Sequence, residues 1–176
     1  MSFHATIRSN TRLIGTFVKT PHHAVIEVLG GTGLDFVILD AEHAPFGMTE
    51  IDRSVLAARS VQTPCLVRLP DDRPAGILRV LDCGADGVLI PHVTTAAQTE
   101  MILRASRYGE NGRGYSATNR AGRFGQRSMT EHLNASGHPV VIPQIEDPVA
   151  VENIESIAAV KGITALFVGP ADLAVA

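Results

Sequence analysis

Two acidic residues each stand just after a short apolar run in the second half of the sequence. Glu146 follows the run 140–145, and Asp172 comes after the run 165–168, with an amphipathic helical pattern between them. In a parallel array of alternating strands and helices, residues that follow the strands meet at one edge, where such folds keep their chemistry. Two carboxylates with open coordination positions suit Mg²⁺, Mn²⁺ or a similar divalent ion. The alternative is that each acid only caps the helix that follows it.

Other polar residues follow apolar runs nearer the start of the chain. Asp40 lies three residues before His43, a spacing at which a carboxylate can orient an imidazole and stabilise its protonated form. Arg68 ends the next apolar run, and a guanidinium there needs an anion. That anion is either a carboxylate of the protein, or a substrate carboxylate or enolate. His92 follows the fourth run and is placed to line the same mouth, although a packed or hydrogen-bonded residue at the rim is the simpler interpretation.

Three further features each have two interpretations. Lys19 ends the first run and can form a Schiff base, but a surface or salt-bridged lysine is the simpler interpretation. Asp82 falls late in a predicted helix, where the helix dipole disfavours an acid, so it is either solvated or part of an interface with another subunit. The segment 112–114, Gly-Arg-Gly, is either a flexible turn or a backbone cradle for an anion.

For these residues to meet at one edge of a sheet, strands and helices must alternate along the whole chain. The predicted strands are short apolar runs, as expected of strands buried on both faces: Leu13–Val18, Phe36–Asp40, Cys65–Arg68, Gly87–Pro91, Val140–Ile145 and Ala165–Val168. Helical patterns lie between them: Met48–Val61, Pro74–Cys83, Ala96–Tyr108 and Pro148–Val160. The segment Gly109–Gln126 has no apolar period, which predicts a long ordered loop or lid, and a further short strand is possible near Gly114.

Alternating strands and helices predict a parallel sheet, either open and doubly wound or closed as a barrel. The glycine-rich segment Gly30–Gly33 comes after a helical pattern and before a strand, so it is predicted to end the helix rather than to bind a dinucleotide. The barrel is therefore favoured. We expect a single domain over residues 1–176, a (β/α)₈ TIM-type barrel that lacks its last strand and C-terminal helices.

The composition limits the classes of function. Hydrophobic residues make up 45% of the 176 residues, and the net charge of −3 comes with scattered lysines and arginines, which argues against a nucleic-acid partner. No apolar run is long enough to span a bilayer, and no secretory signal is visible. Cys65 and Cys83 have neither disulfide nor zinc spacing and are expected in the core. A cytoplasmic protein is the expectation.

Several of these segments together resemble the HpcH/HpaI aldolase family of metal-dependent pyruvate aldolases. The segments that carry the resemblance are Asp40–Pro45, Val67–Arg68, Gly84–Pro91, Gln144–Glu146 and Gly169–Leu173. The resemblance runs from about Leu13 to the last residue. It implies a (β/α)₈ barrel assembled into homo-oligomers, commonly hexamers, with a divalent cation such as Mg²⁺, Mn²⁺ or Co²⁺. Family members continue for roughly another third of their length beyond this point.

The resemblance also implies a role for each matching residue. Glu146 and Asp172 match the metal ligands. Arg68 matches the arginine that binds the pyruvyl oxygen, His43 the acid–base histidine and Asp40 its partner. Asp82 matches an acid that reaches the histidine region of a neighbouring active site. The residues that match the pyruvate-binding surface are Gln144, Gly169, Pro170 and Ala171.

The implied reaction is reversible cleavage of a 4-hydroxy-2-oxo acid to pyruvate and an aldehyde, by way of a pyruvate enolate. Three alternatives stay open at this point. One is a Schiff-base aldolase that uses Lys19. The second is a carbon–carbon lyase acting on an acyl-thioester, similar to the citrate lyase β and malyl-CoA lyase group. The third is an inactive barrel fragment.

Overall fold

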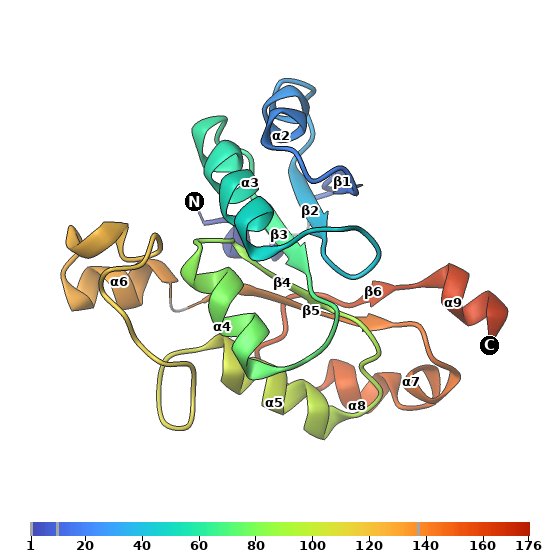
Figure 1. Ribbon diagram of the computed structural model, residues 1–176. Coiled ribbons are helices and arrows are strands. Elements are labelled where there is room, and N and C mark those ends of the chain that lie inside the picture. The colour runs from blue at the N-terminus through green and yellow to red at the C-terminus, as the bar shows by residue number, and fades with distance from the viewer. Residues whose placement is uncertain (1, 10, 137) are drawn as a thin grey trace.

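Six parallel strands form one curled sheet, a half-barrel, in the order β1 to β6 (Figure 1). The computed structural model describes residues 2–9, 11–136 and 138–176. The strands are β1 (Gly15–Val18), β2 (Phe36–Asp40), β3 (Cys65–Arg68), β4 (Gly87–Ile90), β5 (Val140–Ile145) and β6 (Phe167–Val168). Each strand pairs in parallel with its neighbour in sequence. The all-parallel α/β architecture confirms the predicted class and is consistent with part of a TIM-type barrel.

Helices alternate with the strands, and most of them cover the outer face of the sheet. They are α1 (Phe3–Ile7), α2 (His23–Gly30), α3 (Met48–Ser60), α4 (Pro74–Asp82), α5 (Ala96–Ser106), α6 (Met129–Ser136), α7 (Pro148–Glu152), α8 (Ile154–Ala158) and α9 (Pro170–Val175). Figure 1 shows α2 to α5 and α8 along the convex side of the sheet, with α6 and its preceding loop extending to one side. None of the helices in the described residues is long and apolar enough to cross a membrane.

The strands bury alternate residues on two faces, as the apolar runs predicted. Residues such as Val37, Leu39 and Val67 belong to a large cluster that packs against the outer helices. Ile38 and Leu66 belong to a second cluster on the concave face, which also contains Phe3 of α1. Because side chains alternate along a strand, residues two positions further along the chain from Ile38 and Leu66 also point into the half-barrel.

Most predicted segments agree with the structure to within one or two residues, and two predictions need correction. The expected helix 148–160 is two helices, α7 and α8, which meet at Asn153. The Asn153 side chain donates a hydrogen bond to the carbonyl of Thr94, at 2.9 Å, and this bond holds the break in place. There is no strand at Gly114, because the amide of Arg113 turns back to the carbonyl of Arg107 at 2.8 Å. The region before β5 instead contains a short 3₁₀ turn, Arg123–Gly125, and α6.

Candidate active site at the carboxyl ends of the strands

Polar side chains gather at the carboxyl ends of the strands, inside the curve of the sheet. Asp40 and Arg68 are direct partners across β2 and β3, and both continue the inward-facing positions of Ile38 and Leu66. Gln144 does the same on β5, two residues after Ile142. The alternation of the strands therefore brings these side chains into one mouth, as the sequence predicted.

Arg68 and Asp40 form a buried, two-pronged ion pair. The Arg68 Nε and Nη2 atoms donate to the two carboxylate oxygens at 3.0 and 2.7 Å, and the exposed fractions are 7% for Arg68 and 0% for Asp40. Lys19 Nζ lies 3.5 Å from Asp40 Oδ2. Burial acts to raise the pKa of Asp40, but the hydrogen bonds from Arg68 and from the backbone N–H of His43 outweigh it and lower the pKa. Asp40 is thus a fixed anion that sets the orientation of the guanidinium.

Glu146 is held just beyond the end of β5 and is 2% exposed. Its Oε1 accepts the backbone N–H of His92 at 2.7 Å, and its Oε2 accepts a hydrogen bond from the side-chain amide of Gln144. Gly169 packs against this carboxylate: a Cβ there would lie 2.8 Å from Glu146 Cβ and 3.0 Å from its Oε2. Only glycine permits that approach, which explains the residue type in a segment predicted to bind substrate.

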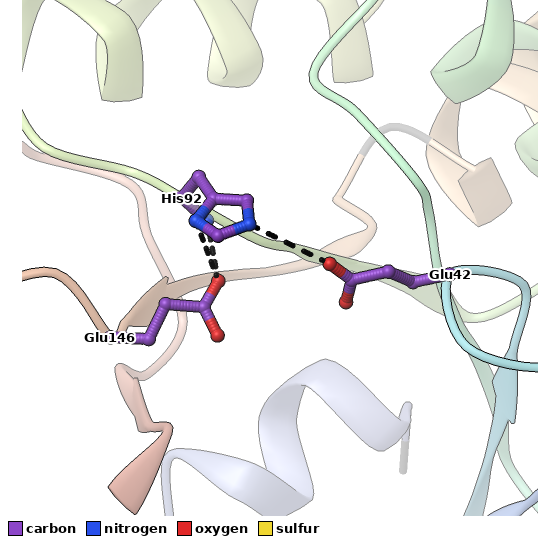
Figure 2. A group of neighbouring side chains, drawn as sticks. All are labelled: Glu42, His92 and Glu146. Atoms are coloured by element: carbon purple, nitrogen blue, oxygen red, sulfur yellow. Dashed lines mark hydrogen bonds and ion pairs between the residues drawn. The ribbon is translucent and has the colours of Figure 1, made fainter. Parts of the chain in front are cut away.

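Glu42, His92 and Glu146 converge from three different strand ends, as Figure 2 shows. One ligand atom from each lies within 4.8 Å of the others. His92 Nε2 is 3.8 Å from Glu42 Oε1, and its Nδ1 is 3.4 Å from Glu146 Oε1 and 3.2 Å from Asp147 Oδ2. His92 holds a left-handed backbone with φ of 52°, which is uncommon for a residue with a side chain and often marks a functional site.

The electrostatics of this group favour a cation. Burial raises the pKa of Glu42, and the nearby Glu146 adds to the rise although Arg68 and His43 oppose it. For His92, partial burial acts to lower the pKa, but the hydrogen bond with Asp147 and the charge of Glu146 prevail, so the pKa is raised. Glu42 Oε2 is buried without a hydrogen bond among the described residues. Two carboxylates and an imidazole are donors that divalent metals accept, so this donor set fits a divalent metal ion.

His43 lies at the same mouth but does not pair with Asp40 as expected. Asp40 Oδ1 accepts the backbone N–H of His43 at 3.1 Å, while both carboxylate oxygens are engaged by Arg68. The imidazole instead lies 3.7 Å from Glu42 Oε2 and is half exposed. The structure therefore corrects the partner: the acid beside the imidazole is Glu42, because Arg68 occupies Asp40.

The remaining predicted residues, including Asp172, are not among the three side chains that converge in the described part of the chain. Asp172 is exposed on α9, one turn beyond Gly169, and its carboxylate forms no hydrogen bond or ion pair within the described part of the chain. Pro170 and Ala171 begin the same helix and are exposed. Asp82 ends α4 shortly before β4 begins, at the opposite end of the strands, and its Oδ1 is buried without a hydrogen-bond partner among the described residues.

Sequence reasoning missed Glu42 and assigned His92 to the rim. A signal for Glu42 was available, because it lies two residues after Asp40 and so keeps the inward parity of β2. The place of His92 after the fourth strand indicated that it can line the mouth, but the reach of its ring between Glu42 and Glu146 depends on its left-handed backbone.

The sequence pattern of the HpcH/HpaI aldolase/citrate lyase family matches residues 13–176. The chain belongs to this family. It is 39% identical to a protein of Novosphingobium aromaticivorans named 4-hydroxy-2-oxovalerate aldolase, over 98% of this chain and 66% of the relative. It is 35% identical to 5-keto-4-deoxy-D-glucarate aldolase of Klebsiella pneumoniae, over 99% of this chain and 68% of the relative. The chain thus spans about two thirds of the length of these relatives.

Solved structures of the family have the same fold. The crystal structure of a family member from Burkholderia cenocepacia superposes with a TM-score of 0.91 at 29% identity, covering 98% of this chain and 70% of the other. The curled sheet and its helices are therefore the family's arrangement over almost the whole chain.

Proposed function

We propose that the chain belongs to a metal-dependent pyruvate aldolase that reversibly cleaves a 4-hydroxy-2-oxo acid to pyruvate and an aldehyde. The observation that carries the proposal is the convergence of Glu42, His92 and Glu146 beside the fixed guanidinium of Arg68, in a member of this family. The names of the relatives at 39% and 35% identity support the reaction class. The complete domain would be a (β/α)₈ barrel, to which this chain contributes six strands.

The proposed metal ligands are Glu146 and Asp172, with Glu42 and His92 close enough to Glu146 to complete or support the site. When bound, a divalent ion supplies Lewis-acid stabilisation of negative charge that develops on an oxo oxygen of the substrate. The proposal favours Mg²⁺, Mn²⁺ or Co²⁺, since carboxylates admit all three.

Arg68 is proposed to hold the anionic end of pyruvate and to stabilise the developing enolate oxygen. The residue is 7% exposed, and Asp40 fixes two of its N–H groups. A preorganised charge costs little reorganisation when negative charge develops near it. The remaining donors of the fork are then available to the substrate. Gln144 and the backbone of Gly169 lie beside Glu146.

His43 is proposed to transfer the proton to and from the aldehyde oxygen. Its backbone is tied to Asp40 while its imidazole stays half exposed at the mouth, where a second substrate would enter. Glu42, 3.7 Å away, is placed to support the protonated imidazole. Asp82 lies at the other end of the strands and is proposed to act in a neighbouring subunit of a homo-oligomer.

Lys19 serves as the test of a Schiff-base alternative. Its Nζ atom lies 3.5 Å from the carboxylate of Asp40, so an ion pair accounts for this lysine without a Schiff base. The decisive experiment follows hydrogen–deuterium exchange at the pyruvate methyl group by NMR in D₂O. We expect exchange with Mg²⁺ or Mn²⁺ that is abolished by excess EDTA and by Glu146→Gln, and retained in Lys19→Arg. Exchange that persists in EDTA would refute the metal-dependent mechanism.

A further inference from the structure

A second polar cavity lies at the amino ends of the strands, away from Glu146. Its volume is about 220 Å³. Asp86 and Pro139, which line it, immediately precede β4 and β5. The start of α1 and the end of α3 also contribute to the wall. The cavity is therefore separate from the candidate active site, and none of the roles proposed above uses it.

Positive charge dominates the lining of this cavity. Three arginines line it, Arg59, Arg113 and Arg127, against one carboxylate, Asp86. The histidines His4 and His138 also line it. In the described ranges, no ion pair includes any of these three arginines. Burial, followed by the charges of Arg120, Arg127 and Arg123, lowers the pKa of Arg59, which reflects the crowding of like charge.

Asp52, an acid next to the cluster, is already paired with another arginine. Asp52 receives hydrogen bonds from Arg120 Nε and Nη2, the shortest at 2.8 Å. Arg59 Nη1 and the Arg120 side chain both border Gly84, so the two arginines are close together, and only one of them has a carboxylate. Arg59 thus forms no ion pair among the described residues, and Asp86 in the same lining is the carboxylate whose charge acts on it.

Arg113 provides an independent observation. It is 7% exposed, and its Nε and Nη2 atoms are buried without an acceptor among the described residues. Its guanidinium stacks on the ring of Tyr108, with Cζ 4.0 Å from the centroid, but stacking satisfies the charge and not the N–H donors. Buried N–H donors without acceptors are costly, so the free Nε and Nη2 groups of this residue indicate that an acceptor belongs here.

We propose that the cavity binds a small oxyanion of the phosphate class, either free phosphate or the phosphate group of a small metabolite. The fork of N–H donors on arginine matches the oxygens of such an anion, and three forks on one cavity match its multiple charge. The volume exceeds the roughly 30 Å³ that one water molecule occupies in the liquid. The bound anion would link α3 to the loop that contains Arg113 and Arg127 and so would stabilise this end of the sheet.

Thermal unfolding and isothermal titration calorimetry of the 176-residue chain test the proposal, with sodium phosphate compared with sodium chloride at equal ionic strength. We expect phosphate, and not chloride, to raise the unfolding midpoint. Arg59→Gln should weaken phosphate binding at least tenfold. Arg53→Gln removes the same charge from an exposed site on the same helix that does not line the cavity, so it should leave binding unchanged.

Asp86→Asn provides a gain-of-affinity test that damage to the fold cannot imitate. The variant removes the single carboxylate of the lining, and its amide oxygen can still accept the backbone N–H of Cys65, which Asp86 Oδ2 accepts at 2.9 Å. We expect phosphate to bind several-fold more tightly. A sugar phosphate that binds more tightly than phosphate identifies a metabolite, and equal binding identifies the free ion; both support the site. Phosphate binding that is unchanged in Arg59→Gln or in Asp86→Asn would overturn the proposal, as would equal effects of phosphate and chloride.

Discussion

Replacing Asp40 by Asn tests how the site holds its arginine. The carboxylate is 0% exposed and meets the Arg68 fork at 3.0 and 2.7 Å. The amide keeps the size of the side chain and one acceptor oxygen but removes the charge. Arg68 would remain 7% exposed with a buried positive charge whose main partner is neutral. The variant therefore measures the free energy of an uncompensated buried charge.

The expected loss of unfolding free energy is about 3 kcal/mol, the lower end of the range for breaking a buried ion pair. The lower end applies because Glu42 Oε2 lies 3.3 Å from Arg68 Nε and still offers a partner. Replacing both members, as Asp40→Asn with Arg68→Met, should cost less than the two single changes added together. The expected coupling is about 2 kcal/mol, within the range for residues in direct contact.

Urea unfolding at pH 7, followed by circular dichroism, measures these differences. Asp71→Asn is the matched control, because Asp71 pairs with Arg73 at 3.4 Å on the surface and should cost less than about 1 kcal/mol. The pKa of Asp40 is lowered by folding, so its contribution is present at neutral pH and is lost as the pH falls through the folded pKa. The gap between the parent protein and the variant should narrow below about pH 4. Additive single and double changes, or a gap that does not depend on pH, would refute the reasoning.

Three further outcomes are expected. Glu146→Gln should weaken Mn²⁺ binding by roughly a hundredfold in calorimetry, because it removes a buried carboxylate ligand; unchanged affinity would remove Glu146 from the metal site. Gly169→Ala should lower Mn²⁺ affinity about tenfold, since its Cβ would lie 3.0 Å from the Glu146 carboxylate, whereas Gly114→Ala, with open space around it, should have no effect. In metal-free protein, NMR titration should place the pKa of His92 above its ordinary value, and Asp147→Asn should lower it; because folding raises this pKa, the associated stabilisation is present at low pH and lost as pH rises through it.

The parallel sheet was predictable because its signal is strong and local. Apolar runs such as Cys65–Arg68 are buried on both faces, as in a parallel sheet. The helical periodicity between these runs indicates that strands and helices alternate. The same alternation predicted that Asp40, Arg68 and Glu146 would meet. Each of these residues ends or directly follows a strand, and parallel strands end at the same edge of the sheet. The break at Asn153 was not predictable in this way, because it depends on a hydrogen bond to Thr94, far away in the sequence.

The partner of each charged residue was harder to predict than its place. Asp40 precedes His43 by three residues, a spacing that favours a local pair, yet the strand register places Arg68 directly beside Asp40. Backbone hydrogen bonds set the relative positions of two residues that are paired across a sheet. The ion pair between such residues therefore forms in preference to a pair with a residue that is near in sequence but flexible. The amide of Ala41 extends that ladder by donating to the carbonyl of Arg68 at 2.9 Å, which carries the register on to Glu42.

The assignment of Glu42 and His92 to the site thus depends on backbone geometry just past the strand ends. His92 reverses its backbone at φ of 52°, and this turns its N–H towards Glu146 while its ring reaches between Glu146 and Glu42. A residue with a side chain adopts that conformation at a cost of the order of 1–3 kcal/mol. The hydrogen bond from His92 N–H to a buried carboxylate offsets part of that cost. The strained His92 and the buried Glu146 therefore support each other. The backbone turn that brings His92 to Glu146 could not be predicted from residue types, although the role of Glu146 could.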